Sequence, residues 1–117
     1  MQELEIINIL KENDLSDVEV LKNEEEYVLV NFYFDFDKEE FSNAWYNEYY
    51  FPYLYDFAND EVLEVIEQVI ETLDVEGEMM AFQMTEKTSD YVQVMALFTE
   101  EDSNVVIEDV VREYIAK

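Results

Sequence analysis

Alternating polar and apolar residues mark residues 27–36 as the clearest strand in the chain. Side chains two residues apart share one face of a strand. One face of this segment is therefore predicted to carry Val28, Val30, Phe32, Phe34 and Phe36, and the opposite face Tyr27, Leu29, Asn31, Tyr33 and Asp35. Residues 17–21 alternate in the same way, and the polar run that follows them indicates a turn, so the two segments predict a hairpin.

Apolar residues spaced three and four apart predict helices over residues 2–13, 60–73 and 103–115. A further helix is expected to open at Asp37, because Glu40 follows it three residues later as in a capping pair. That helix should end near Tyr50, since Pro52 disfavours helical backbone just before it. Residues 51–57 are then either an irregular aromatic connection or a helix that restarts at the proline.

Two more strands are predicted over residues 78–86 and 90–98, which gives the element order α-β-β-α-α-β-β-α. We expect an α+β fold in which a four-stranded, mainly antiparallel sheet has its helices packed on one face. The second face of that sheet is half-polar and should be either solvated or an interface. It would present Tyr27, Tyr33, Gln83, Tyr91, Gln93 and Met95.

Net charge changes this picture, because 31 acidic and 6 basic residues leave −25 on 117 residues. Hydrophobic residues still make up 50% and aromatic residues 15%, which argues against disorder and predicts a single acidic domain over residues 1–117. Duplex DNA carries one charge per about 1.7 Å, so 25 charges correspond to about 40 Å, or about 12 base pairs. A compact domain of this length is about 35 Å across. Its charge density therefore matches that of DNA.

A saline habitat is the alternative source of such acidity. The content of Ile, Asn, Tyr and Phe, and the excess of Glu over Asp, favour a functional origin instead.

Most catalytic chemistry is excluded by the residues that the chain lacks. Without His or Cys there is no nucleophile–histidine pair and no thiolate metal site, and the single Gly77 leaves no phosphate-binding loop. Residues 35–40 begin like a calcium loop, but Glu40 stands where that loop needs Gly and Tyr46 where it needs Glu. We therefore expect no enzymatic activity, no cofactor and no metal site.

Nucleic acid and membranes are also unsuitable partners. Six scattered basic residues cannot hold DNA or RNA directly. No apolar run approaches the roughly 20 residues that span a bilayer, and an anionic membrane surface would repel the chain. The first residues lack the basic start and apolar core of a signal peptide, so a cytoplasmic protein is expected.

Carboxylates along the predicted helix 60–73 form the first candidate site. Asp60, Glu64, Glu67 and Glu71 share one stripe, spaced about 4.5–6 Å along the axis, close to the roughly 7 Å between the phosphates of one DNA strand. No basic residue occurs between Lys38 and Lys87 to neutralise them. The stripe is either an imitation of a nucleic-acid backbone or a solvated acidic face. The candidate partner-binding carboxylates are Asp60, Glu61, Glu64, Glu67, Glu71, Glu24, Glu25 and Glu26.

Aromatic residues concentrated between Tyr27 and Phe57 form the second candidate site. One helix face cannot bury all of those in residues 45–57, so some tyrosines should be exposed. Tyrosine is enriched at interfaces and offers a π-face to Arg or Lys. Tyr46, Tyr50 and Tyr53 are predicted to anchor a partner, although a tyrosine-rich core edge accounts for the pattern equally well.

The leading hypothesis is a non-enzymatic, DNA-mimic-type inhibitor of bacterial or phage origin that occludes the basic nucleic-acid groove of a partner, such as a restriction or CRISPR enzyme. The alternative is an acidic chaperone or immunity protein that masks one cognate basic protein. A further alternative is an acidic interaction domain whose partner uses the apolar or tyrosine face. The expected partner offers a basic protein surface, such as that of a nucleic-acid-binding enzyme, and a homodimer remains open.

A short pattern in the middle of the chain bears on the second hypothesis. Asn43 and Trp45, followed by Phe51, Pro52 and Tyr55, resemble a signature of a bacterial family structurally akin to type III secretion chaperones. Those chaperones are also small, acidic and α+β, so the resemblance implies a chaperone-like role. The match covers about thirteen residues and departs from the signature at Tyr46. A match of this length does not assign the chain to that family.

Overall fold

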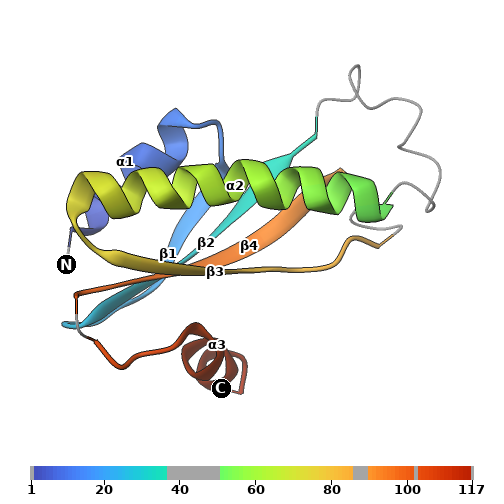
Figure 1. The fold of residues 1–117 in the computed structure, drawn as a ribbon. Helices are drawn as coiled ribbons and strands as arrows, with labels where there is room; N and C mark the ends of the chain where they lie inside the picture. The colour runs from blue at the N-terminus through green and yellow to red at the C-terminus, as the bar shows by residue number, and fades with distance from the viewer. Residues whose placement is uncertain (1, 37–50, 86–89, 102, 117) are drawn as a thin grey trace.

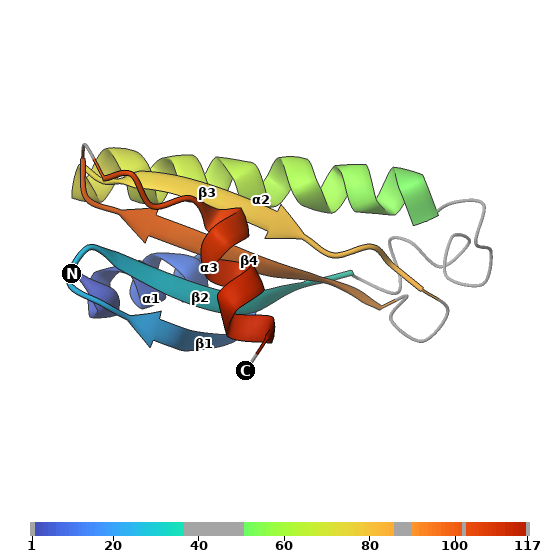
Figure 2. The same ribbon diagram turned by 90° about the horizontal axis from the view of Figure 1, so that it is seen from below.

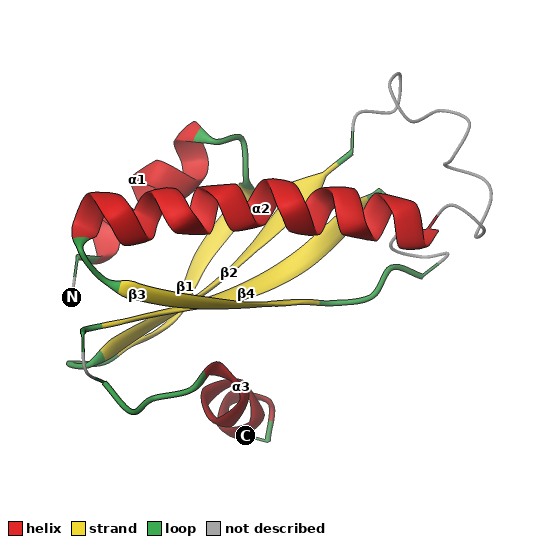
Figure 3. Cartoon of the chain, viewed as in Figure 1, coloured by secondary structure: helices red, strands yellow, loops and turns green. Residues whose placement is uncertain are grey.

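A computed structural model describes residues 2–36, 51–85, 90–101 and 103–116. Within these ranges the chain forms three helices and four strands, coloured by type in Figure 3. In chain order they are α1 (Glu3–Glu12), β1 (Ser16–Asn23), β2 (Tyr27–Asp35), α2 (Phe51–Leu73), β3 (Glu76–Ala81), β4 (Tyr91–Thr99) and α3 (Ile107–Ile115).

The four strands form one antiparallel sheet in the order β1-β2-β4-β3, which confirms the predicted α+β class. Each strand is paired with its hairpin partner or with the central strand of the other hairpin. β2 and β4 pair along their whole lengths, from Tyr27 opposite Thr99 to Asp35 opposite Tyr91. The two hairpins are therefore joined only through this central pair.

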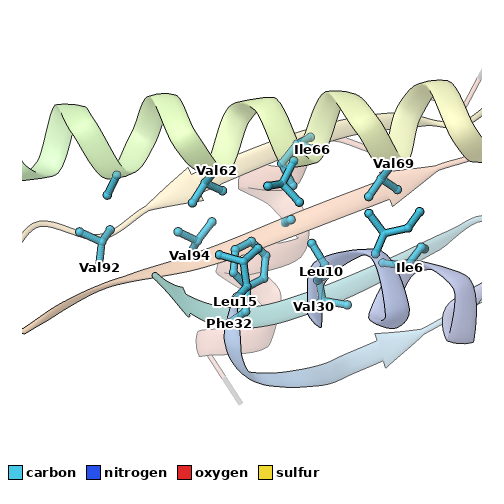
Figure 4. Close-up of a cluster of buried hydrophobic side chains, with 14 of the residues drawn as sticks. Ile6, Leu10, Leu15, Val30, Phe32, Val62, Ile66, Val69, Val92 and Val94 are labelled. Carbon is cyan, nitrogen blue, oxygen red and sulfur yellow. The ribbon is translucent and has the colours of Figure 1, made fainter. Parts of the chain in front are cut away.

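The larger hydrophobic core lies between the sheet and the two helices α1 and α2 (Figure 1). α2 lies along the sheet beside α1, and the alternation of β2 points its predicted apolar face toward both helices. Figure 4 shows Val62, Ile66 and Val69 of α2 directed at the strand residues below them. The fully buried members include Ile6, Leu10, Val28, Val30, Phe32, Leu54, Val62, Val69 and Phe98.

α2 begins earlier than residue 60, where the sequence pattern placed the helix start. Leu54 and Ala58 are fully buried and continue the stripe of Val62 backward at four-residue spacing, so of the two alternatives for residues 51–57 the helical one holds. A proline in the first turn of a helix loses no intrahelical hydrogen bond. The expected helix from Asp37 to Tyr50 lies outside the described residues.

α3 crosses the opposite face of the sheet (Figure 2). The expectation that all helices share one face is therefore wrong for this helix. The reason is that Leu29, Met95 and Leu97 make part of that face apolar, and α3 covers them with Ile107, Val110 and Val111. The helix begins at Ile107 and not near residue 103, because the Ser103 hydroxyl accepts a hydrogen bond from Val105 N at 3.2 Å and closes a turn there.

A carboxylate of the sheet caps this helix. Glu78 Oε2 on β3 accepts a hydrogen bond from Ile107 N at 2.8 Å, and the capping residue Val106 has no side chain that could do so. At the far end, Lys22 Nζ of β1 lies 3.7 Å from Glu113 Oε1. Both contacts hold α3 at a fixed place on the sheet.

Replacing Glu78 by alanine is expected to loosen α3 without unfolding the sheet. Loss of a charged cap leaves the first amides of the helix unsatisfied and costs about 1 kcal/mol. Amide hydrogen exchange should accelerate selectively over residues 107–115. Glu76→Ala removes the same charge from an exposed position of the same strand and should leave that exchange unchanged; equal acceleration in both variants would contradict the capping role.

Two helices end with an aspartate in left-handed backbone, where glycine is usual. Asp14 has φ 64° and Asp74 has φ 55°. After α1, Leu15 N donates to Leu10 O at 3.2 Å and Asp14 N to Lys11 O at 3.1 Å, the bonds of a Schellman ending. Side chains are strained in this conformation, although Asp tolerates it better than most residues.

The variant Asp14→Gly is therefore expected to be more stable than the natural chain by about 0.5–1 kcal/mol. That corresponds to a rise of several degrees in the thermal midpoint, about 4 °C or more per kcal/mol. Asp14→Asn removes the same negative charge while keeping a side chain. If the asparagine variant gains as much, relief of charge repulsion and not backbone strain explains the effect.

Candidate protein-interaction surface

The outer face of α2 presents a row of exposed carboxylates. Asp60, Glu64, Glu67 and Glu71 are all exposed, while most apolar residues between them are turned toward the sheet and Leu63 alone of these is 43% exposed. Their three- and four-residue spacing places successive carboxylates on one side of the helix, about 4.5–6 Å apart along its axis. The structure thus brings these four predicted residues together.

Glu61 stands apart from this row. It lies about 90° around the helix from the middle of the row and, with Glu64 of the row, lines a groove beside Gln68 and Asn13 at the junction of α2 and α1. Asn13 Nδ2 donates to Gln68 Oε1 at 3.2 Å across this junction. Glu61 is exposed, but it borders the groove and does not extend the row.

The second predicted group, Glu24–Glu26, occupies the turn between β1 and β2, and all three side chains are exposed. Glu100 N donates a hydrogen bond to Glu26 O at 3.2 Å, so this turn lies beside the end of β4. Glu100 and Glu101 in turn line one recess with Leu73 and Asp74 at the end of α2. The turn, the end of β4 and the end of α2 therefore meet at one end of the molecule (Figure 1).

Together these residues form what we call the acidic band. It runs along α2 and continues over the end of the sheet, and all its members are exposed: Asp60, Glu64, Glu67, Glu71, Asp74, Glu100, Glu101, Glu24, Glu25 and Glu26. The sequence analysis missed Asp74, Glu100 and Glu101. A signal for them was available. If the two central strands pair antiparallel, the end of β4 must lie beside the turn between β1 and β2.

Cationic side chains are absent from the acidic band. Among the described residues, the basic ones are Lys11, Lys22 and Arg112, on α1, β1 and α3. Lys22 is half-buried and directed at Glu113 on the α3 face. Nothing within the described part of the band neutralises its carboxylates.

The predicted tyrosine anchors are tested at one position only. Tyr53 is 63% exposed in the first turn of α2, at the opposite end of that helix from Asp74. It lies on the same side of the helix as the carboxylate row. Tyr46 and Tyr50 lie outside the described residues.

The described residues form neither a metal site nor a membrane-spanning helix. No group of three or more His, Cys, Asp or Glu residues in the described chain is arranged to hold a metal ion. Asp35, the first residue of the calcium-like run, accepts a hydrogen bond from the Ser16 hydroxyl, and the remainder of that run after Phe36 is not described. None of the described helices is both long and apolar enough to cross a bilayer.

Comparison of the chain with protein-family models, curated proteins and solved structures finds no significant match.

Proposed function

We propose that this protein is a non-enzymatic inhibitor that docks its acidic band onto the basic nucleic-acid groove of a partner protein and thereby excludes DNA or RNA from it. The observation that carries the proposal is an unneutralised row of carboxylates on α2 that continues into a second exposed group at the end of the sheet. We expect this protein and its nucleic-acid-binding partner to be located together in the cytoplasm.

Size and charge together support this proposal. The molecule is 44 Å along its longest axis, and its 25 net charges correspond to about 40 Å of duplex DNA. Ten of the carboxylates form the acidic band, so a basic groove that accommodates DNA would meet a continuous run of negative charge on this side of the molecule. The long-range field would steer association and make it sensitive to salt.

The arrangement also carries a cost that a merely soluble protein would avoid. Solubility asks for a net charge of about 2–8 in a small domain, several-fold less than here. Each pair of like charges three or four residues apart destabilises a helix by a few tenths of a kcal/mol. A lysine in place of every second carboxylate would have made these pairs stabilising by a similar amount. α2 contains no basic residue at all.

A displacement assay tests the proposal. The purified protein is added to complexes of labelled duplex DNA with several unrelated basic proteins, between about 50 and 200 mM salt. We expect displacement of the DNA at low salt and a steep loss of competition as salt rises. Failure to displace DNA from any of them at low salt would refute a nucleic-acid mimic.

The second candidate function is masking of one cognate basic protein, as by an acidic chaperone or immunity protein. Its support is the exposed apolar surface of α2, where Tyr53 is 63% and Leu63 43% exposed beside the carboxylate row. Apolar contacts are not screened by salt, so such a partner would stay bound at high salt. Pull-downs from the native host at low and high salt distinguish the two functions.

A further inference from the structure

One end of the sheet's α3 face is left uncovered by α3. The helix packs on Leu29, Met95 and Leu97, while β2 and β4 continue past it (Figure 2). On that continuation Tyr33 lies opposite Gln93 and Asp35 opposite Tyr91, and residues that pair in register share a face. Phe82 N donates to Gln93 O at 2.9 Å, which places β3 beside them. We call Tyr33, Phe82, Tyr91 and Gln93 the tyrosine patch.

The aromatic rings of the patch are only partly covered. Tyr33, Tyr91 and Phe82 are half-buried, and neither tyrosine belongs to the core cluster beneath α3. The Tyr33 and Tyr91 rings meet edge-to-face, with centroids 5.1 Å apart and planes at 88°. In such a pair, the ring that contributes its edge keeps both π-faces clear of the other ring.

Polar groups fix the shape of the patch. Gln93 Nε2 donates to Asn31 Oδ1 at 2.7 Å, and Asn31 is itself only 6% exposed. The Ser16 hydroxyl, opposite Tyr33 on β1, donates to Asp35 Oδ2. The patch is therefore held by hydrogen bonds across three neighbouring strands.

The charged residues described around the patch are mostly negative. Asp35 lies opposite Tyr91, and Glu19 of β1 lies opposite Asn31, so both carboxylates are on the face that carries the rings. Both are exposed, and Lys22 further along β1 is directed at α3. Aromatic faces bordered by carboxylates suit a cation that can stack and donate hydrogen bonds at once. Guanidinium does both, since it is planar and presents a fixed fork of donors, whereas ammonium is a compact, strongly hydrated charge.

We propose that the tyrosine patch binds an arginine side chain on an extended segment of the basic partner. This inference rests on the proposed function, because it takes the same cationic partner and adds a second contact on the face of the sheet opposite α2. The molecule is 31 Å and 20 Å along its two shorter axes. An extended segment of about ten residues reaches about 33 Å, which exceeds both, so one segment can pass from α2 around an edge of the sheet to the patch.

The test compares two labelled peptides, one of alternating arginine and glycine and one with lysine at each arginine position. The double variant Tyr33→Leu/Tyr91→Leu keeps apolar side chains in the strands and removes the rings. We expect it to bind the arginine peptide roughly tenfold more weakly, and the lysine peptide nearly as well as the natural chain does. Tyr33→Phe/Tyr91→Phe should restore most of the arginine affinity. Tyr114→Leu, which removes a half-buried tyrosine of α3 outside both the acidic band and the tyrosine patch, is the matched control.

Several results would overturn the proposal. They are equal affinity of the natural chain for the two peptides, an equal loss for both in the leucine variant, or the same loss in Tyr114→Leu. Light scattering shows whether a second copy of this chain occupies the patch instead, in which case the leucine variant would turn a dimer into a monomer. Thermal unfolding verifies that the variants fold. If only this inference fails, the natural chain and the leucine variant should both still displace DNA from basic proteins. If the proposed function fails, the natural chain itself should not displace DNA.

Discussion

Replacing Glu64, Glu67 and Glu71 by glutamine is expected to weaken binding to a basic nucleic-acid-binding protein by about ten- to a hundredfold at low salt. Each lost charge removes about 0.5–1 kcal/mol of attraction to a cationic surface, and the sum corresponds to that range. The three residues are exposed and lie in the middle of the acidic band. Competition titrations against labelled DNA at two salt concentrations measure the effect, which should shrink as salt rises.

The same variant is expected to be more stable than the natural chain. Asp60 and Glu64, Glu64 and Glu67, and Glu67 and Glu71 are like-charged neighbours that each cost about 0.2–0.5 kcal/mol. Their removal should stabilise the fold by about 1 kcal/mol and raise the thermal midpoint by a few degrees. Opposite signs for stability and binding would indicate that the carboxylates are retained for recognition.

A matched variant separates position from charge. Glu5, Glu12 and Glu108 are exposed on α1 and α3, outside the acidic band, so their replacement by glutamine changes net charge by the same amount. We expect its binding to fall by much less than that of the α2 variant. Equal losses would mean that total charge decides binding, and that the band has no special role.

Replacing Phe32 by alanine is expected to cost about 3–5 kcal/mol, because it removes one of the two largest fully buried side chains of the core. Phe32 is fully buried in the middle of β2, between the strands and α2 (Figure 4). A protein that carries this much self-repulsion has little stability to spare, so the variant should be largely unfolded at low salt. Circular dichroism during chemical denaturation measures the loss.

Added salt is expected to restore part of the structure of Phe32→Ala, because screening weakens repulsion without changing the cavity. Phe32→Leu fills more of the site and should cost less than half as much. A loss below about 1 kcal/mol for the alanine variant would place Phe32 outside the core that the structure describes.

The central strand β2 was the most predictable part of the fold. The alternation of residues 27–36 sorts every side chain of β2 to the correct face, and the β1–β2 hairpin is closed by the polar turn that follows residues 17–21. β3 was predicted less well, because it ends at Ala81 and Gln83 lies with Tyr55 of α2 and not on the α3 face. The α2 row was predictable for the same reason as β2, since Asp60 and Glu71 lie on one helix and their relation depends only on helical spacing. Local periodicity thus accounts for both.

Relations between distant segments could not be predicted in this way. The pairing of β2 with β4 places Glu26 beside Glu100, and no local pattern connects those residues. The position of α3 depends on Leu29 and Leu97, which form an apolar area on a sheet face whose other residues are largely tyrosine and glutamine. The number of these apolar residues on that face does not by itself indicate which helix covers them. The start of α2 depends on burial of Leu54 and Ala58 under tertiary contacts, which overrides the boundary suggested by charge and proline.

The central β2–β4 pair also determines how the chain can fold. Each hairpin can close early from local contacts, but the sheet exists only once residues 27–35 meet residues 91–99. Pairing across such a long separation is intrinsically slow. Here it must also bring together two halves that are both strongly anionic, so ionic strength should act mainly on the folding rate and much less on the unfolding rate.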